Sequence, residues 1–386
     1  MLILRIILAG VAVIALAARP GTAGGAALAC TAAALDAAIG AAVVPALRIV
    51  APMVVFLAAA LTLAGMLERA GLGERVAAEL ARRAHGSSRA LYAYVCLTCA
   101  ALTATVSLDG AVVLMVPVLL ALAHRHQAPF APLFLGTVVV ANASSIAVPQ
   151  GNPTNLLIIE RLGIAPTTFL AHMVLPGVIA AVLCAGFVAM TERHRLGIPY
   201  TPFPGPRPPV ERPERDAVLA FLVAATAAWL APIFGVAPWW PFSGAVALAL
   251  LAARRRPHAI VPWQIGVQIA AMLVVVRALG VPDPGRLGSA LPALLLVALV
   301  VGGAAALLNN LPVGASAVAL VTGAPFGYAA SVGLAVGSLA TSQGSVATLI
   351  ASELAGPEAP ALPVHRLAPL AAVAVLITTL AMWLTL

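Results

Sequence analysis

The chain has 386 residues, of which 62% are hydrophobic and only 9% are charged, and its mean hydropathy is +1.06. Soluble domains carry roughly a quarter charged residues, so this composition excludes an ordinary soluble protein. The net charge of +8 comes from arginines clustered in short loops, which is the positive-inside bias of membrane proteins and not a nucleic-acid surface.

Long apolar stretches divide the chain into candidate membrane spans. A helix needs about 20 mostly apolar residues to cross a bilayer, and the short alternating segments of a membrane β-barrel are absent. The candidate spans are residues 2–18, 25–44, 46–66, 89–106, 110–123, 131–158, 168–190, 217–236, 242–253, 263–280, 291–323, 328–351 and 367–386. We interpret the first of these as a transmembrane helix and not a signal peptide, because many spans follow it. The sequence therefore predicts an all-α polytopic membrane protein with about 11–12 spans.

Two polar segments organise the chain. Residues 67–88 mix apolar and charged side chains and predict a short amphipathic helix at the cytoplasmic surface. Residues 192–216 are rich in proline and predict a semi-rigid cytoplasmic linker. We therefore expect N-terminal transmembrane helices over 1–44, a first repeat over 45–191 and a second repeat over 217–386.

Two pairs of apolar segments are joined by polar tips. The first tip is "SLDG" at 107–110, and the second is "NNLP" at 309–312. Each flanking arm is short for a membrane span, and irregular backbone inside a bilayer is tolerated only where protein or a water-filled cavity satisfies its polar groups. We therefore predict two re-entrant hairpins.

A short motif follows each hairpin. "PQGNPTNLLI" (149–158) aligns with "SQGSVATLIA" (342–351), and each lies in a predicted broken helix, over 131–158 and 328–351. Arginines flank the first hairpin and are nearly missing beside the second, so the two hairpins open to opposite sides of the membrane. Two inverted repeats with discontinuous helices are the architecture of secondary transporters whose site lies at the midplane.

Polar side chains concentrate at these breaks. All five asparagines of the chain, Asn142 included, lie in or beside them. Amides, hydroxyls and half-helix ends can bind a small neutral or anionic oxygen-bearing solute, or a desolvated cation. The predicted substrate- or ion-binding residues are Ser107, Asp109, Gly110, Gln150, Gly151, Asn152, Thr154, Asn155, Asn309, Asn310, Pro312, Gln343, Gly344, Ser345 and Thr348.

Two carboxylates lie in apolar segments. An intramembrane carboxylate is costly, so Asp109 is a candidate for proton coupling. The alternative is a structural one, in which Asp109 is the N-cap of the second hairpin arm. Asp36 lies outside the repeats, and we expect it to have a structural or interfacial role.

Motifs of enzymes are missing from the sequence. It has no lysine and no G-x-x-x-x-G-K-[ST], G-x-S-x-G or H-E-x-x-H motif, so we expect no ATPase, hydrolase or protease activity. Cys96 and Cys99 have C-x-x-C spacing, which allows a soft-metal or metalloid site but is explained as well by small residues filling a helix. We expect no resident metal and no cofactor, with a proton or sodium ion as the coupling ion.

The tips and broken helices resemble those of bacterial arsenite-efflux permeases, the membrane subunits of arsenical pumps. "SLDGAVVLMVPVLLAL" is similar to their first hairpin tip, "ANASSIAVPQGNPTNLL" to their first broken helix, "LLNNLPVGASAVAL" to their second tip and "GSVATLI" to their second broken helix. These permeases belong to a wider ion-transporter superfamily that includes divalent-anion/sodium symporters, and "GNPTN" resembles that group equally well.

The resemblance implies a scaffold-plus-transport-domain fold, often dimeric, with the site between the two tips and the two broken helices. It implies arsenite or antimonite efflux by proton exchange from a multi-pass protein of the bacterial inner membrane. The alternative is a sodium- or proton-coupled permease for a small inorganic or carboxylate anion, and a non-transporting subunit or channel is a third interpretation. The partners it implies are the lipid bilayer, an oxyanion or metalloid solute, a second copy of the chain and a cytoplasmic ATPase, but no nucleic acid.

Overall fold

The computed structural model describes residues 2–18, 22–69, 71–201, 212–237, 239–252, 263–278 and 289–386. Within these ranges the regular elements are helices, which confirms the predicted all-α fold. Those of the first half are α1 (Leu2–Ala18), α2 (Ala23–Ala38), α3 (Val44–Arg69), α4 (Leu72–Ala84), α5 (Ser88–His126), α6 (Phe130–Ser144), α7 (Pro153–Leu162), α8 (Pro166–Thr191) and α9 (Arg193–Leu196). Those of the second half are α10 (Arg212–Leu230), α11 (Trp239–Ala252), α12 (Trp263–Ala278), α13 (Leu291–Leu308), α14 (Asn310–Leu320), α15 (Ala324–Val336), α16 (Val346–Ala355) and α17 (Val364–Trp383). Residues 202–211 of the predicted linker lie outside the described residues.

Six of the described helices are long and apolar enough to cross a membrane. They cover Val44–Leu67, Ser88–His126, Phe130–Ala147, Pro166–Thr191, Leu291–Leu308 and Val364–Trp383. Shorter apolar helices include α1, α2, α14 and α15. Of these, α14 is the second arm of the second hairpin, and α15 is the first part of the second broken helix. The chain is therefore a multi-pass membrane protein.

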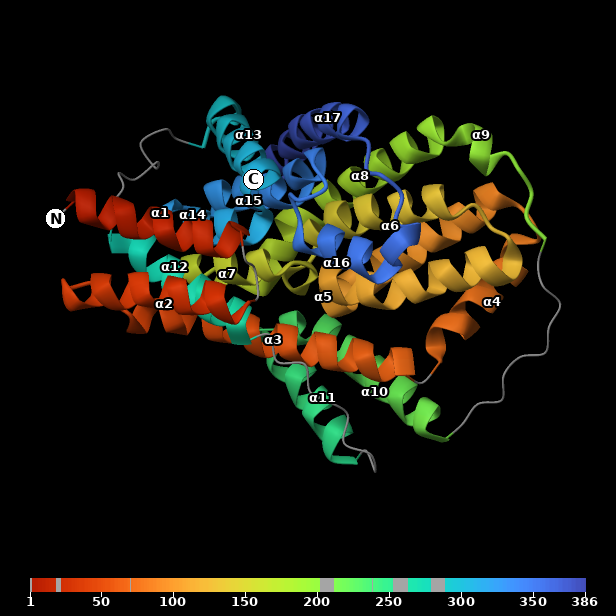
Figure 1. The fold of residues 1–386 in the computed structure, drawn as a ribbon, viewed down its shortest axis with the longest axis horizontal. Coiled ribbons are helices and arrows are strands. Elements are labelled where there is room, and N and C mark those ends of the chain that lie inside the picture. The colour runs from red at the N-terminus through yellow and green to blue at the C-terminus, as the bar shows by residue number, and fades with distance from the viewer. Residues whose placement is uncertain are drawn as a thin grey trace.

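Each half of the chain contributes to two groups of helices (Figure 1). The first group holds α1, α2 and α3 from the first half and α10, α11 and α12 from the second, with α12 packed on α1, α2 and α3. The second group holds the hairpins and broken helices, in which α5 packs on α6, α13 on α15, and α8 on both α6 and α17. Helix α3 joins the groups because it contacts α5 and α7 as well as α11 and α12.

Close backbone contact fastens the second hairpin to its broken helix. A Cβ atom at Gly337 of the short 3-10 turn after α15 would lie 2.4 Å from the Cα of Gly302 in α13. A Cβ at Gly333 would lie 2.5 Å from the carbonyl oxygen of Ala298. Lipid tails are as apolar as leucine, so membrane helices associate through such small-residue packing and not through the hydrophobic effect. The hairpin and the broken helix are therefore one packed unit.

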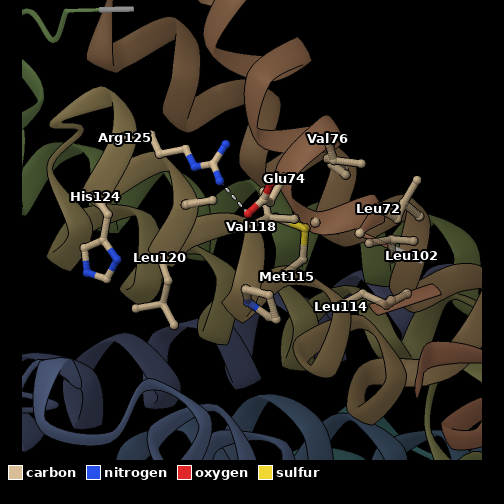
Figure 2. A pocket seen from close by; sticks show the side chains of 15 residues that line it. Leu72, Glu74, Val76, Leu102, Leu114, Met115, Val118, Leu120, His124 and Arg125 are labelled. Carbon is tan, nitrogen blue, oxygen red and sulfur yellow. Dashed lines mark hydrogen bonds and ion pairs between the residues drawn. The ribbon is translucent and has the colours of Figure 1, made fainter. Parts of the chain in front are cut away.

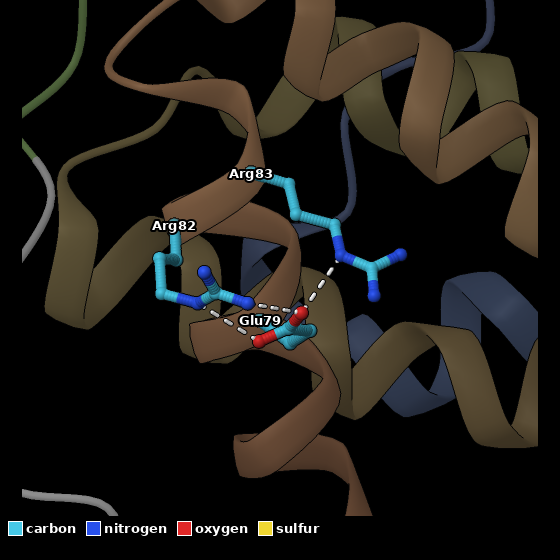
Figure 3. A network of polar contacts seen from close by, with 3 residues as sticks. All are labelled: Glu79, Arg82 and Arg83. Atoms are coloured by element: carbon cyan, nitrogen blue, oxygen red, sulfur yellow. Dashed lines mark hydrogen bonds and ion pairs between the residues drawn. The ribbon is translucent and has the colours of Figure 1, made fainter.

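Helix α4 is the amphipathic helix predicted within residues 67–88. Its inner face buries Ala77, Leu80, Ala81 and Ala84. On its outer face the Glu79 carboxylate accepts hydrogen bonds from Arg82 Nε at 3.0 Å and Arg83 Nε at 2.7 Å (Figure 3). The bond from Arg82, followed by that from Arg83, holds the pKa of Glu79 below its ordinary value. These i,i+3 and i,i+4 pairs support the helix at a polar surface.

One end of the molecule is rich in arginine. Helix α4, the end of α5, the end of α8 and the start of α17 meet there, and we call it the basic end, defined by Arg82, Arg83, Arg125, Arg195 and Arg366. Ion pairs of Arg125 with Glu74 at 2.6 Å and of Arg366 with Glu192 at 3.6 Å join its elements, as does a contact of His124 Nε2 with the Glu358 carboxylate at 2.9 Å.

Candidate functional site

The first hairpin tip is a single residue with left-handed backbone. Ser107 has φ 72° and ψ 167°, and it divides α5 into two arms. The Ser107 side chain is fully buried, and its Oγ has no hydrogen-bond partner. The break makes Ser107 the residue at the N-cap position of the second arm. The structural alternative, in which Asp109 is the N-cap, is therefore wrong. Asp109 is the second residue after Ser107 and lies within the first helical turn of that arm.

Asp109 is a buried carboxylate without a described partner. Its side chain is 7% exposed, and no described residue donates a hydrogen bond to it or pairs with it. A carboxylate in the first turn of a helix is favoured by the partial positive charge of the N-terminus. The position of Asp109 beside the tip therefore stabilises a charge that the surrounding apolar side chains would disfavour.

The second tip has the same backbone form and holds the second broken helix. Asn309 has φ 88° and ψ 148°, and its Oδ1 accepts from Leu311 N at 3.1 Å, so it caps α14. The next residue, Asn310, donates its backbone N–H to Gly344 O at 2.8 Å and accepts from Val346 N at 3.3 Å through Oδ1. Asn310 thereby caps α16 from a distant part of the chain. Pro312 lies buried in the first turn of α14.

The first broken helix runs from α6 through two 3-10 turns into α7. Asn152 is the N-cap of α7. Its Oδ1 accepts hydrogen bonds from Thr154 N at 3.0 Å and from Thr154 Oγ1 at 2.8 Å. Asn155 Nδ2 donates to the carbonyl oxygens of Ser145 at 2.9 Å and Val148 at 3.1 Å. The asparagines therefore bind backbone groups that the missing helical turns leave free.

The second broken helix repeats the extended backbone of the first at two matched positions. Val148 (φ −134°, ψ 152°) and Asn152 (φ −138°, ψ 133°) correspond to Thr341 (φ −135°, ψ 158°) and Ser345 (φ −132°, ψ 136°). The two segments share the pattern S-x-A-x-x-Q-G, at 145–151 and 338–344.

The glycine of this pattern is required by close backbone contact in both segments. A Cβ at Gly151 would lie 2.3 Å from Ser145 O, and one at Gly344 would lie 2.1 Å from Ser338 O. The two serines also make equivalent bonds: Ser145 Oγ donates to Asn142 O at 2.7 Å, and Ser338 Oγ donates to Ala335 O at 3.0 Å. Neither serine was among the predicted site residues. Extending the repeat alignment six residues upstream of Gly151 and Gly344 reveals both.

The two broken helices run in opposite directions past each other. The first broken helix begins with α6 at the basic end, and the second finishes with α16 at the same end. There His124, just before α6, contacts Glu358, just after α16. At the opposite end, Leu162 of α7 lies against Gly327 of α15, where a Cβ would meet Leu162 Cδ1 at 2.7 Å. The repeats are therefore inverted, as predicted for this fold class.

The repeats meet at their breaks. Asn142 Nδ2 donates to Thr348 Oγ1 at 3.5 Å, which joins α6 to α16. Thr154 of α7 packs so closely on α14 that a Cβ at Gly314 would lie 2.7 Å from Thr154 Cγ2. The α16 helix also packs on α5. The structure thus gathers the predicted tips and breaks around one centre, and every predicted site residue except Gln343 is buried.

Five side-chain oxygens at this centre have no hydrogen-bond partner among the described residues. They belong to buried side chains and are Ser107 Oγ, Asn142 Oδ1, Gln150 Oε1, Asn155 Oδ1 and Ser345 Oγ. The three amide oxygens can only accept hydrogen bonds, whereas the two hydroxyls can also donate. No described hydrogen bond at the breaks comes from an arginine or histidine. The arrangement suits a ligand that carries hydrogen-bond donors or a cation.

A separate cavity lies nearer the basic end. It measures about 570 Å³ and lies between α4 and the two arms of α5 (Figure 2). Its lining is mainly apolar, with the Arg125–Glu74 ion pair at one side. None of the predicted site residues lines it. The candidate solute site therefore lies at the breaks and not in this cavity.

The three buried cysteines pack inside helices α5 and α8. Cys99 Sγ contacts Thr137 O at 3.4 Å, and Cys96 and Cys184 are buried in α5 and α8. Among the described residues, no three His, Cys, Asp or Glu side chains are grouped to hold a metal ion. The C-x-x-C spacing therefore has a packing explanation.

Comparison with known proteins gives a family. A segment of this chain is 33% identical over 129 residues to "Silicon efflux transporter LSI3" of Oryza sativa subsp. japonica, covering 33% of this chain and 26% of that protein. Another is 25% identical over 186 residues to "Putative arsenical pump membrane protein" of Bacillus subtilis (strain 168), covering 43% and 42%. A third is 27% identical over 133 residues to "46 kDa membrane protein" of Mycobacterium leprae (strain TN), covering 34% and 31%. The matches thus span less than half the length of each relative.

The family model described as citrate transporter (CitMHS) matches residues 2–333, which is most of the chain and includes both hairpins and the first broken helix. Its match agrees with the inverted helical architecture and the polar breaks described above. The chain therefore belongs to the citrate transporter (CitMHS) family and is a membrane transporter, not an enzyme.

Proposed function

We propose that the protein is a secondary transporter that exports a small uncharged hydroxylated acid, with arsenite or antimonite as its solute, in exchange for protons. The observation that carries this proposal is the set of unpartnered oxygens at the first tip and in the two broken helices. Arsenous acid and its antimony analogue present hydroxyl donors to such acceptors and need no cationic side chain. A buried acceptor without a donor is costly, so a solute rich in hydroxyl groups is complementary to this centre.

Two of the relatives support this class of solute. The rice protein is named for silicon efflux and the Bacillus subtilis protein for an arsenical pump. Silicic acid and arsenous acid are both small, uncharged and hydroxylated at neutral pH. The matches extend over parts of those proteins only, so they support the solute class and leave the particular solute to be tested.

We propose that the Asp109 carboxylate binds and releases the exchanged proton. It is the one acidic side chain among the predicted site residues, and it is buried two residues after Ser107 at the first tip. An ionisable residue inside a membrane span is a functional candidate because its burial has to be compensated. Proton binding at Asp109 would alternate with solute binding at the neighbouring oxygens.

A carboxylate anion is the second candidate, and two observations favour it. The family model is described as citrate transporter. In addition, α7, α14, α16 and the second arm of α5 all begin at the breaks, and helix N-termini attract anions. Sodium or protons would then couple to uptake.

Flux measurements on purified protein in liposomes distinguish these proposals. Vesicles with an imposed pH gradient are given arsenite, antimonite, silicic acid or citrate, with and without sodium. We expect arsenite and antimonite movement that depends on the pH gradient and on the protein. Citrate movement without arsenite movement would replace the first proposal by the second, and no solute-specific flux would contradict both.

We also propose a place and orientation for the protein, the bacterial inner membrane with the basic end in the cytoplasm. The arginines of α4, α5, α9 and the start of α17 support this orientation, because loops rich in arginine remain on the cytoplasmic side.

A further inference from the structure

The two breaks have one backbone conformation but opposite exposure. In the first break, Val148 is 1% exposed and Gln150 is 2% exposed. In the second, the residues at the equivalent positions are Thr341, which is partly exposed, and Gln343, which is exposed. The dihedral angles match at the two extended positions of each break, so the difference in exposure comes from what covers each break.

The exposed break lies well inside the membrane-spanning segment. Helix α15 before it has 13 residues and α16 after it has 10, which correspond to about 20 Å and 15 Å of helix. Ser342 and Gln343 are exposed between them. Irregular backbone and polar side chains do not face lipid tails at such a depth, because nothing there satisfies their hydrogen bonds. This face therefore requires water or protein beside it.

Hydrogen bonding at the two glutamines differs in the same sense. Gln150 Nε2 donates to Ala104 O at 2.8 Å, and this bond is partly buried. Gln343 Nε2 is 3.5 Å from Leu307 O, at the limit of hydrogen bonding, and this contact is exposed. The Gln343 side chain is therefore held weakly, whereas its backbone oxygen accepts from Asn309 Nδ2 at 2.8 Å and so touches the buried second tip.

We propose that the second break is the face through which the solute reaches the centre, with Ser342 and Gln343 lining a water-filled approach while the first break is closed. The solute class rests on the proposed function, but the exposure of this face does not. The weakly held Gln343 amide offers a donor and an acceptor at the entrance, and its neighbours Asn309, Gly344 and Ser345 form the inner side.

Labelling of introduced cysteines in proteoliposomes tests this proposal. The background is Cys30→Ala, since Cys30 is exposed and the other three cysteines are buried. Gln343→Cys is compared with Gln150→Cys, its equivalent in the first repeat. Both membrane faces are exposed to a charged methanethiosulfonate reagent. We expect Gln343→Cys to react at least about tenfold faster than Gln150→Cys, because only water-exposed thiolates react readily.

A second pair guards against misfolding, because Gln150→Cys loses a buried hydrogen bond. Ser342→Cys and Ser345→Cys each replace one oxygen by sulfur within the same break, and Ser345 is fully buried. Rapid labelling of Ser342→Cys alone supports the proposal. Reaction with an apolar maleimide but not with the charged reagent would show a lipid-facing surface, and a disulfide-linked dimer would show that a second copy covers it. Either result overturns the proposal.

Labelling and transport fail independently. The reaction of the thiol needs folded protein but no solute, so a missing arsenite flux counts against the proposed function alone. Where flux is present, arsenite at saturating concentration is expected to slow the labelling of Gln343→Cys. Unchanged labelling under transport conditions would place the approach elsewhere.

Discussion

At the scale of single residues, the amides of this chain serve mainly the backbone. The sequence predicts that asparagines gather at the breaks, because a chain that is otherwise nearly free of them places them only there. It does not show that Asn152, Asn309 and Asn310 use their side-chain oxygens to cap helices. The partner of Asn310 is Val346, far away in the chain, and no local pattern contains that pairing. The residues left unsatisfied, such as Asn155, are therefore better solute candidates than the capping residues.

The close backbone contact at Gly344 predicts that adding one methyl group there strongly destabilises the fold. Gly344→Ala would place its Cβ 2.1 Å from Ser338 O, a backbone atom that cannot turn aside. We expect a loss of about 1–3 kcal/mol or more in the free energy of unfolding, as for other overpacked sites. Thermal unfolding in detergent measures it. Gly186→Ala in α8, where nothing lies within 4 Å, is the control and should be neutral or slightly stabilising. Equal melting temperatures for the two variants would contradict the contact.

Removal of the Asp109 charge separates coupling from folding. In Asp109→Asn the side chain keeps its size but can no longer exchange a proton, so we expect solute flux that does not respond to a pH gradient. The buried site loses a charge without a described partner, and the thermal stability should stay equal or rise. Flux in proteoliposomes at several pH gradients is the measurement, with Asp109→Glu as the charge-preserving control. An unaltered pH response would exclude Asp109 as the exchanging group.

At the scale of elements, hydropathy predicts the helices well and their internal breaks only approximately. Apolar length and polar punctuation are local properties, so the positions of α3, α8 and α17 follow from the sequence. The first hairpin tip is predicted over residues 107–110, but the non-helical backbone is confined to Ser107. Which residue takes a positive φ depends on the packing of both arms, and that packing involves α16 and α3.

Helices α1, α2 and α12 are tied together by a buried ion pair. Asp36 is fully buried, and its Oδ1 lies 3.3 Å from Arg5 Nε, within ion-pair distance but without hydrogen-bond geometry. Arg5 also donates to Ala278 O at 2.8 Å. This supports the structural role expected for Asp36, although the sequence does not show its partner.

The ion pair gives an asymmetric prediction. Arg5→Met leaves Asp36 buried and unpaired, which should cost about 3–5 kcal/mol. Asp36→Asn leaves Arg5, whose side chain is 27% exposed and can extend toward the polar surface, so we expect a smaller loss. The double variant Arg5→Met with Asp36→Asn should recover much of the stability lost in Arg5→Met. A double-mutant cycle by thermal unfolding measures all three, and additive losses would refute the pairing.

At the scale of the whole molecule, the inverted repeats explain why two unlike ends enclose one site. The first hairpin opens at the basic end, and the second opens at the other end beside Val321 and the start of α15. The inversion was predicted from loop charge and from a ten-residue match. The meeting of Asn142 with Thr348 and of Thr154 with Gly314 was not, because these contacts cross between repeats and depend on how the helices pack.

The proposed orientation places Leu386 on the side of the membrane opposite the basic end. Helix α17 starts at the basic end, where Arg366 pairs with Glu192, and its far end is held by Thr385, whose Oγ1 donates to His172 O at 3.0 Å near the start of α8. With the basic end in the cytoplasm, Leu386 must lie outside it. Alkaline phosphatase fused after Leu386 should be active, and green fluorescent protein fused there should be dark. The opposite pair of results would turn the whole molecule over, and the first hairpin would then open to the outside.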